Sequence, residues 1–256
     1  MKKILLKIAF VTLFAALLVP ATAFAKGPIV IKTLPYTISV PGNYTLAAKL
    51  TYTADLVDAI TISASNVTLD MNGFGITGPG IATSDYSGIT INGNGVEVRN
   101  GYITGFYDGF NIFGIGIKAL NLKIYENAYG IDAVGGAHCA TVCGCTVYGN
   151  PVVGISACGA GNIVTNNVSY NNGDYGIYAI GQSCITGNSS YGNTGVGIYA
   201  GPGSTVKNNS SCNNGTYGIQ TAGTVLLDGN AATGNNGGGV GINYSVAGAT
   251  LGTNTP

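Results

Sequence analysis

The sequence is poor in charge, histidine and tryptophan. Of its 256 residues only ten are Lys or Arg and ten are Asp or Glu, with one His and no Trp. It therefore lacks the basic stripe that would hold nucleic acid or an anionic membrane surface. Beyond residue 19, no apolar run reaches the roughly 18 residues that a membrane-spanning helix needs. We expect neither a nucleic-acid partner nor stable membrane insertion.

The N-terminus has the pattern of an export signal. Three lysines within the first seven residues precede an apolar run over residues 8–19, and small residues at positions 21, 23 and 25 offer cleavage sites. We predict a signal peptide over residues 1–25, cleaved near Ala23 or Ala25, and a secreted or periplasmic mature protein. Without the first three lysines, seven basic side chains face ten acidic ones, a slightly negative balance.

Asparagine recurs at a fixed interval along the second half of the chain. Four positions lie 21 residues apart: Asn167, Asn188, Asn209 and Asn230. A second series follows five residues behind the first: Asn150, Asn172, Asn193, Asn214 and Asn235. A fixed period of this length is the signature of a stacked solenoid, in which each repeat rests on the previous one.

A glycine followed by an apolar residue, β-branched in most repeats, marks the same period. The pairs begin at Gly88, Gly109, Gly130, Gly154, Gly176, Gly197, Gly218 and Gly239. The interval from Gly130 to Gly154 is 24 residues, which indicates a three-residue insertion near Gly135 and Gly136. Within each repeat the apolar residues alternate, as strands require, and Gly and Asn supply the tight corners.

These patterns predict an all-β solenoid of about nine coils, each 21 to 24 residues long. Stacked coils pair equivalent strands in parallel at roughly 4.8 Å per coil. Inward asparagines then form a ladder in which each side chain bonds its neighbours along the stack. We assign residues 55–256 to the solenoid. Residues 26–54 break the period and are predicted to cap its open N-terminal end.

Two segments near the start of the solenoid resemble a known class. The runs over residues 59–73, AITISASNVTLDMNG, and 96–106, VEVRNGYITGF, resemble the first coils of secreted bacterial right-handed single-stranded parallel β-helix proteins of the pectin-lyase-like class. The resemblance covers roughly residues 55–245 and implies that fold. The class includes lyases, hydrolases, epimerases, phage tailspikes and copper-insertion accessory proteins, so it implies no single function.

The charged residues assemble no complete catalytic set. Aligning the second strand of each coil predicts one outward column: Asp70, Arg99, Lys123, Cys143, Thr165, Thr186, Lys207 and Asp228. Cross-coil ion pairs, Asp70 with Arg99 and Lys207 with Asp228, explain these charges without catalysis. Glycoside hydrolysis needs two carboxyl groups roughly 5 to 10 Å apart. Asp108 and Asp132, one coil apart with Asn111 between them, are the best candidates for catalysis or for binding calcium.

Cysteines gather around the predicted insertion. His138, Cys139, Cys143 and Cys145 lie within eight residues, while Cys158, Cys184 and Cys212 are scattered. Free thiols, one disulfide from Cys139 to Cys158, and a soft-metal site on the first four residues are the alternatives. The spacing matches no familiar zinc pattern, so we favour free thiols and expect no cofactor.

Tyrosine provides the remaining sign of function. The outward column of the Gly-Ile strands is predicted to run through Thr90, Asn111, Asp132, Ser156, Tyr178, Tyr199 and Gln220, with Tyr129, Tyr175 and Tyr217 just before the glycines. Rings and amides along a flat sheet suit an extended polysaccharide. We interpret the chain as a monomeric, noncatalytic glycan-binding or structural protein. A carbohydrate-active lyase, hydrolase or epimerase is the first alternative, and a copper-handling accessory protein the second.

Overall fold

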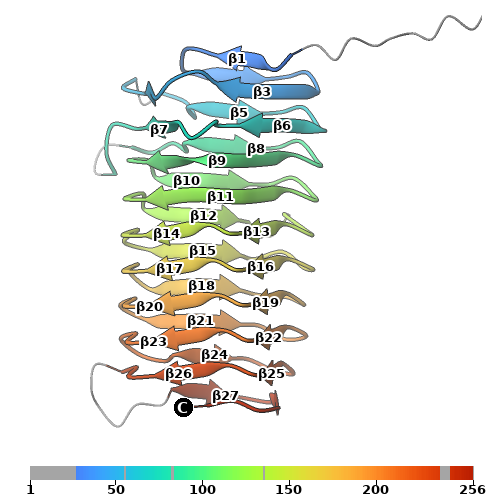
Figure 1. The fold of residues 1–256 in the computed structure, drawn as a ribbon, viewed down its shortest axis with the longest axis vertical. Coiled ribbons are helices and arrows are strands. Elements are labelled where there is room, and N and C mark those ends of the chain that lie inside the picture. The colour runs from blue at the N-terminus through green and yellow to red at the C-terminus, as the bar shows by residue number, and fades with distance from the viewer. Residues whose placement is uncertain (1–26, 55, 82–83, 135, 237–242, 256) are drawn as a thin grey trace, which may run out of the picture.

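The computed structural model describes residues 27–54, 56–81, 84–134, 136–236 and 243–255. These segments form a rod of stacked coils, which Figure 1 shows upright with the coil axis vertical. Every strand pairing is parallel, and strands that follow one another in a sheet come from successive coils. The predicted signal peptide and Gly239 lie outside the described residues. The strand register places Asn243, not Gly239, opposite Gly218, so the last predicted repeat position is wrong. No helix in the described segments is long and apolar enough to span a membrane.

One sheet contributes a single strand to each coil. This ten-stranded sheet consists of β2 (Tyr36–Ile38), β5 (Ile60–Ile62), β8 (Ile89–Ile91), β10 (Asp108–Ile112), β12 (Tyr129–Ala133), β15 (Val153–Ala157), β18 (Tyr175–Ala179), β21 (Val196–Ala200), β24 (Ile219–Thr221) and β27 (Tyr244–Val246). Its order follows the chain.

The other sheet contributes two strands to most coils, joined at a corner. This eighteen-stranded sheet consists of β1 (Ile29–Ile31), β3 (Gly42–Leu46), β4 (Leu50–Thr51), β6 (Val67–Asp70), β7 (Gly75–Thr77), β9 (Glu97–Thr104), β11 (Lys118–Tyr125), β13 (Thr141–Cys143), β14 (Thr146–Tyr148), β16 (Ile163–Thr165), β17 (Val168–Tyr170), β19 (Cys184–Thr186), β20 (Ser189–Tyr191), β22 (Thr205–Lys207), β23 (Ser210–Cys212), β25 (Leu226–Asp228), β26 (Ala231–Thr233) and β28 (Thr250–Leu251). In β9 and β11 the corner is passed without a break.

Alternation along each strand fills the interior of the rod. In the ten-stranded sheet, Ile131, Ile155, Ile177, Ile198 and Ile219 are all fully buried and stack in one file. Stacked apolar side chains from the eighteen-stranded sheet pack against these isoleucines and form one continuous apolar core with them. Burial of apolar area at roughly 25 cal/mol per Å² is the main force that holds the coils together.

The predicted asparagine ladder is confirmed. Asn188 is 2% exposed, and both its backbone N–H and its Nδ2–H donate to Oδ1 of Asn209, at 2.8 and 3.0 Å. The same Nδ2 also donates to the Val164 carbonyl at 2.8 Å. The pattern repeats to Asn254, and the second series continues to Asn243 in the same way. Each asparagine therefore satisfies corner backbone groups and fixes the register of two coils.

Left-handed backbone immediately before these asparagines makes the corner. Gly187 has a φ of 67° and Asn208 a φ of 54°, each one residue before a ladder asparagine. The glycine of each Gly-Ile pair is required for a different reason, which is lack of space for a side chain. A Cβ on Gly176 would lie 2.5 Å from Asn193 Nδ2 and 2.7 Å from the Gly197 carbonyl oxygen, so the ladder leaves no room for a side chain there.

The irregular parts of the chain stay within the coil pattern. Seven residues separate β12 from β13, whereas four separate β18 from β19, which places the three-residue insertion in that turn. The predicted cap segment holds β1 to β4. Strands β2, β3 and β4 pair with β5, β6 and β7, and β1 lies beyond β3 at the end of the sheet.

We expect Asn188→Leu to lower the free energy of unfolding by about 1 to 3 kcal/mol, because the donors of Asn167 and the Val164 carbonyl lose their partner in the core. Urea melts monitored by circular dichroism measure the change. Asn43→Leu, the same substitution at an exposed position of β3, is the control and should leave stability almost unchanged. Equal stability of the two variants would contradict a structural role for the ladder.

Candidate functional site

Two columns of outward side chains run along the outer face of the ten-stranded sheet. We define the polar-aromatic column by its register-paired members: Thr90, Asn111, Asp132, Ser156, Tyr178, Tyr199 and Gln220. The predicted order of this column is confirmed. The pre-glycine column lies three residues earlier in each coil: Ser87, Asp108, Tyr129, Val153, Tyr175, Val196 and Tyr217.

A local departure from alternation brings the two columns onto the same face. Gly109 and Phe110 both face the core, since Phe110 is fully buried and a Cβ on Gly109 would meet Ile124 and Asn127. Asp108 and Asn111, on either side of them, therefore both point outward. They are close enough for Asn111 Nδ2 to donate to Asp108 Oδ2 at 3.1 Å.

The tyrosines form one compact group rather than a continuous row. The rings of Tyr178 and Tyr199 stack with centroids 5.0 Å apart and planes 20° from parallel, as the register predicts. Tyr175 packs across both, at 4.9 and 5.9 Å. In the pre-glycine column, Val153 and Val196 separate Tyr175 from Tyr129 and Tyr217. Because the stacked rings cover one another's faces, their edges and hydroxyl groups are what a ligand meets.

The acidic candidates lie together at the other end of the columns. Asp108 is only 8% exposed, and burial, followed by the charge of Asp132, raises its pKa to about 6. Ser87 connects Asp108 to a third acid, because its hydroxyl donates to Asp108 at 3.4 Å and its N–H donates to Asp58 at 3.0 Å. Burial also raises the pKa of Asp132, and a hydrogen bond from Ser156 lowers it by a smaller amount. The structure thus brings Asp108, Asn111 and Asp132 together.

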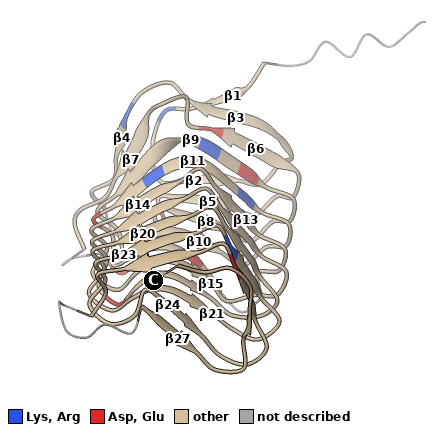
Figure 2. Cartoon of the chain, turned by 60° about the horizontal axis from the view of Figure 1, so that its bottom comes forward, with Lys and Arg blue, Asp and Glu red and all other residues tan. Residues whose placement is uncertain are grey.

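Basic side chains lie away from this face. The strands of the ten-stranded sheet contain no Lys or Arg, and the described chain has six such residues in all: Lys32, Lys49, Arg99, Lys118, Lys123 and Lys207. Four of them are in β9, β11 and β22 of the other sheet, and the blue segments on β9 and β11 can be followed in Figure 2. The outer face of the ten-stranded sheet is therefore acidic.

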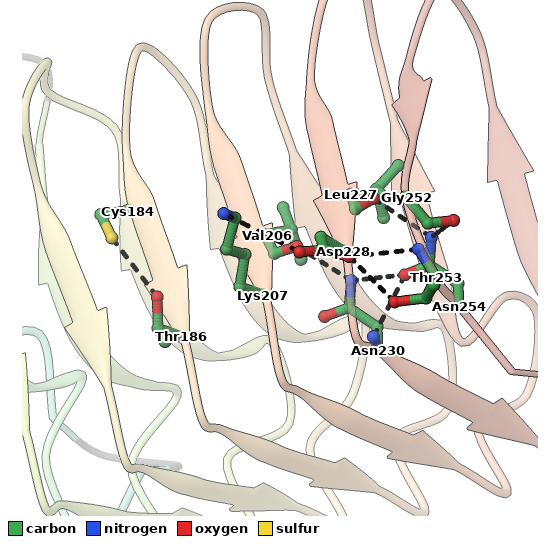
Figure 3. Close-up of polar contacts among 10 residues, drawn as sticks. All are labelled: Cys184, Thr186, Val206, Lys207, Leu227, Asp228, Asn230, Gly252, Thr253 and Asn254. Carbon is green, nitrogen blue, oxygen red and sulfur yellow. Dashed lines mark hydrogen bonds and ion pairs between the residues drawn. The ribbon is translucent and has the colours of Figure 1, made fainter.

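The predicted ion pairs form, with one correction to their column. Arg99 Nε lies 3.0 Å from Asp70 and Nη1 2.8 Å from Glu97. Hydrogen bonding to Asp70 raises the pKa of Arg99, so this guanidinium stays protonated and is unsuited to accept a proton. Lys207 lies 3.9 Å from Asp228, which also accepts hydrogen bonds from Thr253 (Figure 3).

Lys123 was wrongly placed in that column. Leu120 stands between Arg99 and Cys143, whereas Lys123 pairs with Tyr102 and Thr146. The reason is that β11 continues through the corner, so its eight residues supply both columns of the eighteen-stranded sheet.

The cysteine cluster does not converge. All six cysteines are free, so the alternative of a bond between Cys139 and Cys158 is not what the structure contains. Cys145 is buried at the head of the asparagine ladder, where its N–H donates to Asn167 and its thiol to the Ala119 carbonyl. His138 accepts from the Ala160 N–H instead. Among the described residues, no three His, Cys, Asp or Glu side chains lie together in a way that could hold a metal ion.

Sequence reasoning missed a second tyrosine column, on the eighteen-stranded sheet. Tyr125, Tyr148, Tyr170 and Tyr191 stack with centroids 4.8 to 5.1 Å apart and planes within 7° of parallel. The Lys123 ammonium lies 5.2 Å from the first ring centroid. The spacings of 23, 22 and 21 residues lie close to the coil period, so the repeat itself could have revealed this column.

Comparisons with known proteins agree with this architecture. A family model described as a right-handed β-helix region matches residues 129–255. The A-module of the mannuronan C-5 epimerase AlgE6 from Azotobacter vinelandii superposes with a TM-score of 0.65 at 14% identity, over 90% of this chain and 80% of that one. The chain thus has the right-handed parallel β-helix fold. No curated protein sequence matches it.

Two further structures have the same fold. The Dettilon tailspike protein gives a TM-score of 0.59 at 17% identity, over 89% of this chain and 60% of that one. Pectate lyase Pel9A gives 0.52 at 17% identity, over 84% and 69%. Identities this low establish a shared fold and leave function to the residues of the site.

The position of Asp108 predicts a pH dependence of stability. Its folded pKa of about 6 lies above the ordinary 3.8, so the folded state binds more protons between these values. The free energy of unfolding should therefore fall by about 2 kcal/mol as the pH rises from about 4 to about 7. Urea melts at both pH values should show a smaller fall for Asp108→Asn. The control is Asp174→Asn, at an exposed position, which should show the same fall as wild type. If the free energy of unfolding falls equally in wild type and in Asp108→Asn, the prediction is contradicted.

The thiols should differ in reactivity in the folded protein. Burial raises the pKa of Cys145 to about 12, and its side chain is 1% exposed, so almost no accessible thiolate forms near pH 8. Peptide mapping after brief iodoacetamide treatment should find Cys139 and Cys184, which are exposed, alkylated well before Cys145. Labelling of Cys145 at their rate would show that this corner opens.

Proposed function

We propose that the outer face of the ten-stranded sheet binds an extended polysaccharide, and that the protein is a noncatalytic glycan-binding or structural protein. One observation carries the proposal. Side-chain types that bind sugars stand in one register-paired column, polar from Asn111 to Ser156 and aromatic at Tyr178 and Tyr199. Their spacing along the rod is that of parallel strands, roughly 4.8 Å.

The chemistry of the column suits hydroxyl-rich chains. Ring edges and aliphatic carbons of Tyr175, Tyr178 and Tyr199 give a sugar apolar contact, and their hydroxyls make no hydrogen bond within the described parts of the chain. Gln220 follows Tyr199 in the column and adds an amide. A linear glycan lying parallel to the rod axis would meet the partly exposed members of the column, whereas Thr90 and Ser156 are buried.

The names of the similar structures support the same class of ligand. They include enzymes named for mannuronan and for pectate, both of which are polysaccharides. Their fold is shared at low identity, so this support is an analogy. The register of the outward side chains remains the main argument.

The first alternative is a carbohydrate-active enzyme, and the observation that favours it is the pair Asp108 and Asp132. Burial raises the pKa of both carboxyl groups, that of Asp108 to about 6, and glycosidases use a pair of carboxyl groups of which the acid has a raised pKa. Asp108 already accepts two hydrogen bonds, from Ser87 and Asn111. Release of reducing ends or unsaturated sugars from soluble polysaccharides, lost in Asp108→Asn and Asp132→Asn, would establish this alternative over ours.

We also propose that the protein works outside the cytoplasm as a monomer, after removal of residues 1–25. The support is the lysine and alanine pattern around the apolar run 8–19. A copper-handling role, the second alternative, has less support because His138, Cys139, Cys143 and Cys145 do not converge.

The double variant Tyr178→Ala, Tyr199→Ala should weaken glycan binding about fivefold, which corresponds to about 1 kcal/mol of lost aromatic contact. Affinity gel electrophoresis against soluble glucans, chitosan and polygalacturonate measures the change. The control is Tyr148→Ala, Tyr170→Ala, which removes an equally stacked pair, 4.8 Å apart, from the other sheet. A double variant that migrates like wild type on every gel that retards wild type would refute the proposal.

A further inference from the structure

The polar end of the two columns offers hydrogen-bond acceptors in excess of donors. We define the acceptor cluster as Thr90, Asp108, Asn111 and Asp132. Asn111 gives an N–H to Asp108, and Thr90 is its register partner on the preceding strand. Asp132 is its partner on the following strand. Two carboxylates and one amide oxygen are thereby brought to one place.

Two atoms of this cluster are buried without a hydrogen-bond partner. They are Asn111 Oδ1 and Thr90 Oγ1, and Thr90 as a whole is only 6% exposed. Buried polar atoms are normally satisfied, so an unpaired acceptor beside two carboxylates indicates that a donor is missing. This observation is independent of the acidic charges.

Nothing in the described chain supplies that donor as a cation. The strands on this face contain no Lys or Arg. The rings of Tyr107 and Tyr129 lie beside the cluster instead, 5.7 Å apart, with Tyr129 close enough to feel the charges of Asp132 and Asp108. Carboxylates flanked by aromatic rings are the surroundings in which an ammonium group binds well.

We infer that the acceptor cluster receives a primary ammonium group, and that the polysaccharide of the proposed function is therefore a cationic amino-sugar polymer. The inference rests on that proposed function and specifies its ligand. An ammonium has three donors and no acceptor, which matches a pair of carboxyl groups on a face whose strands contain no basic side chain. Asp132 is the half-buried member, so the ligand enters there. The rest of the chain continues over Ser156 to Tyr178 and Tyr199.

The same geometry disfavours two other ligands. A polyuronate would bring a carboxylate to Asp108 and Asp132 with no basic side chain on the sheet to compensate. Calcium takes six to eight oxygen ligands. Here Asp108 Oδ2 already accepts from Ser87 and Asn111, and the described residues provide no group of three acids or other strong ligands.

The test compares three oligosaccharides of equal length on the full-length protein by calorimetry near pH 6.5. They are a β-1,4-glucosamine hexamer, its fully N-acetylated form, and hexagalacturonate. Wild type should bind the glucosamine hexamer about tenfold more tightly than the acetylated form, since a charge-assisted contact is lost on acetylation. Asp132→Asn should remove this preference, while Asp174→Asn, at an exposed position before β18, should retain it.

The outcomes separate this inference from the proposed function. Equal binding of both hexamers, weakened by Tyr178→Ala with Tyr199→Ala, would overturn the ammonium site and leave glycan binding intact. Tighter binding of hexagalacturonate would also overturn it. No binding of any glycan to folded protein would overturn both. Competition by a lysine hexamer as strong as by the glucosamine hexamer would overturn the assignment to a sugar. A melting curve confirms that each variant is folded.

Discussion

Hydrogen bonding between stacked asparagines is the constraint on which the rest of this molecule depends. Each corner of a coil leaves backbone groups inside the rod, where water cannot reach them. The ladder asparagines satisfy those groups in the preceding coil rather than in their own. Asn188 accepts from the Asn167 N–H and donates to the Val164 carbonyl, and Asn209 accepts from the Asn188 N–H. A slip of one residue would leave several buried donors unpaired at once. The ladder therefore fixes the register of every coil from Cys145 to Asn254.

A fixed register turns the outer surface into columns. Because equivalent residues lie one above another, a side chain that contacts a ligand in one coil is followed by the corresponding side chain of the next coil. The two sheets use this differently. The eighteen-stranded sheet carries the ion pairs around Arg99 and Lys207, and the ten-stranded sheet carries acids, amides and rings without a basic side chain. A linear polymer lying along the rod would contact the acids, amides and rings of the ten-stranded sheet in that order.

The sequence analysis predicted most of what the repeat determines, although it missed the column from Tyr125 to Tyr191, and it missed what elements adjacent in space determine. The order from Thr90 to Gln220 follows from a 21-residue period, and it is correct. Lys123 was misplaced because β11, like β9, runs straight through a corner at which the later coils have two separate strands, and no local sequence pattern predicts this. The burial of Asp108, only 8% exposed, comes from residues that surround it in space, and so does its raised pKa. Spacing alone predicted the pair with Asp132 and not its environment.

The central claim is that the ten-stranded sheet is the ligand face, and a crystal structure with a bound glucosamine hexamer tests it most directly. The account predicts a sugar chain parallel to the rod axis, crossing Tyr178 and Tyr199, with an amine nitrogen within about 3 Å of an Asp132 oxygen. Density on the stacked rings of Tyr148 and Tyr170 instead, or at the ends of the rod, would contradict it.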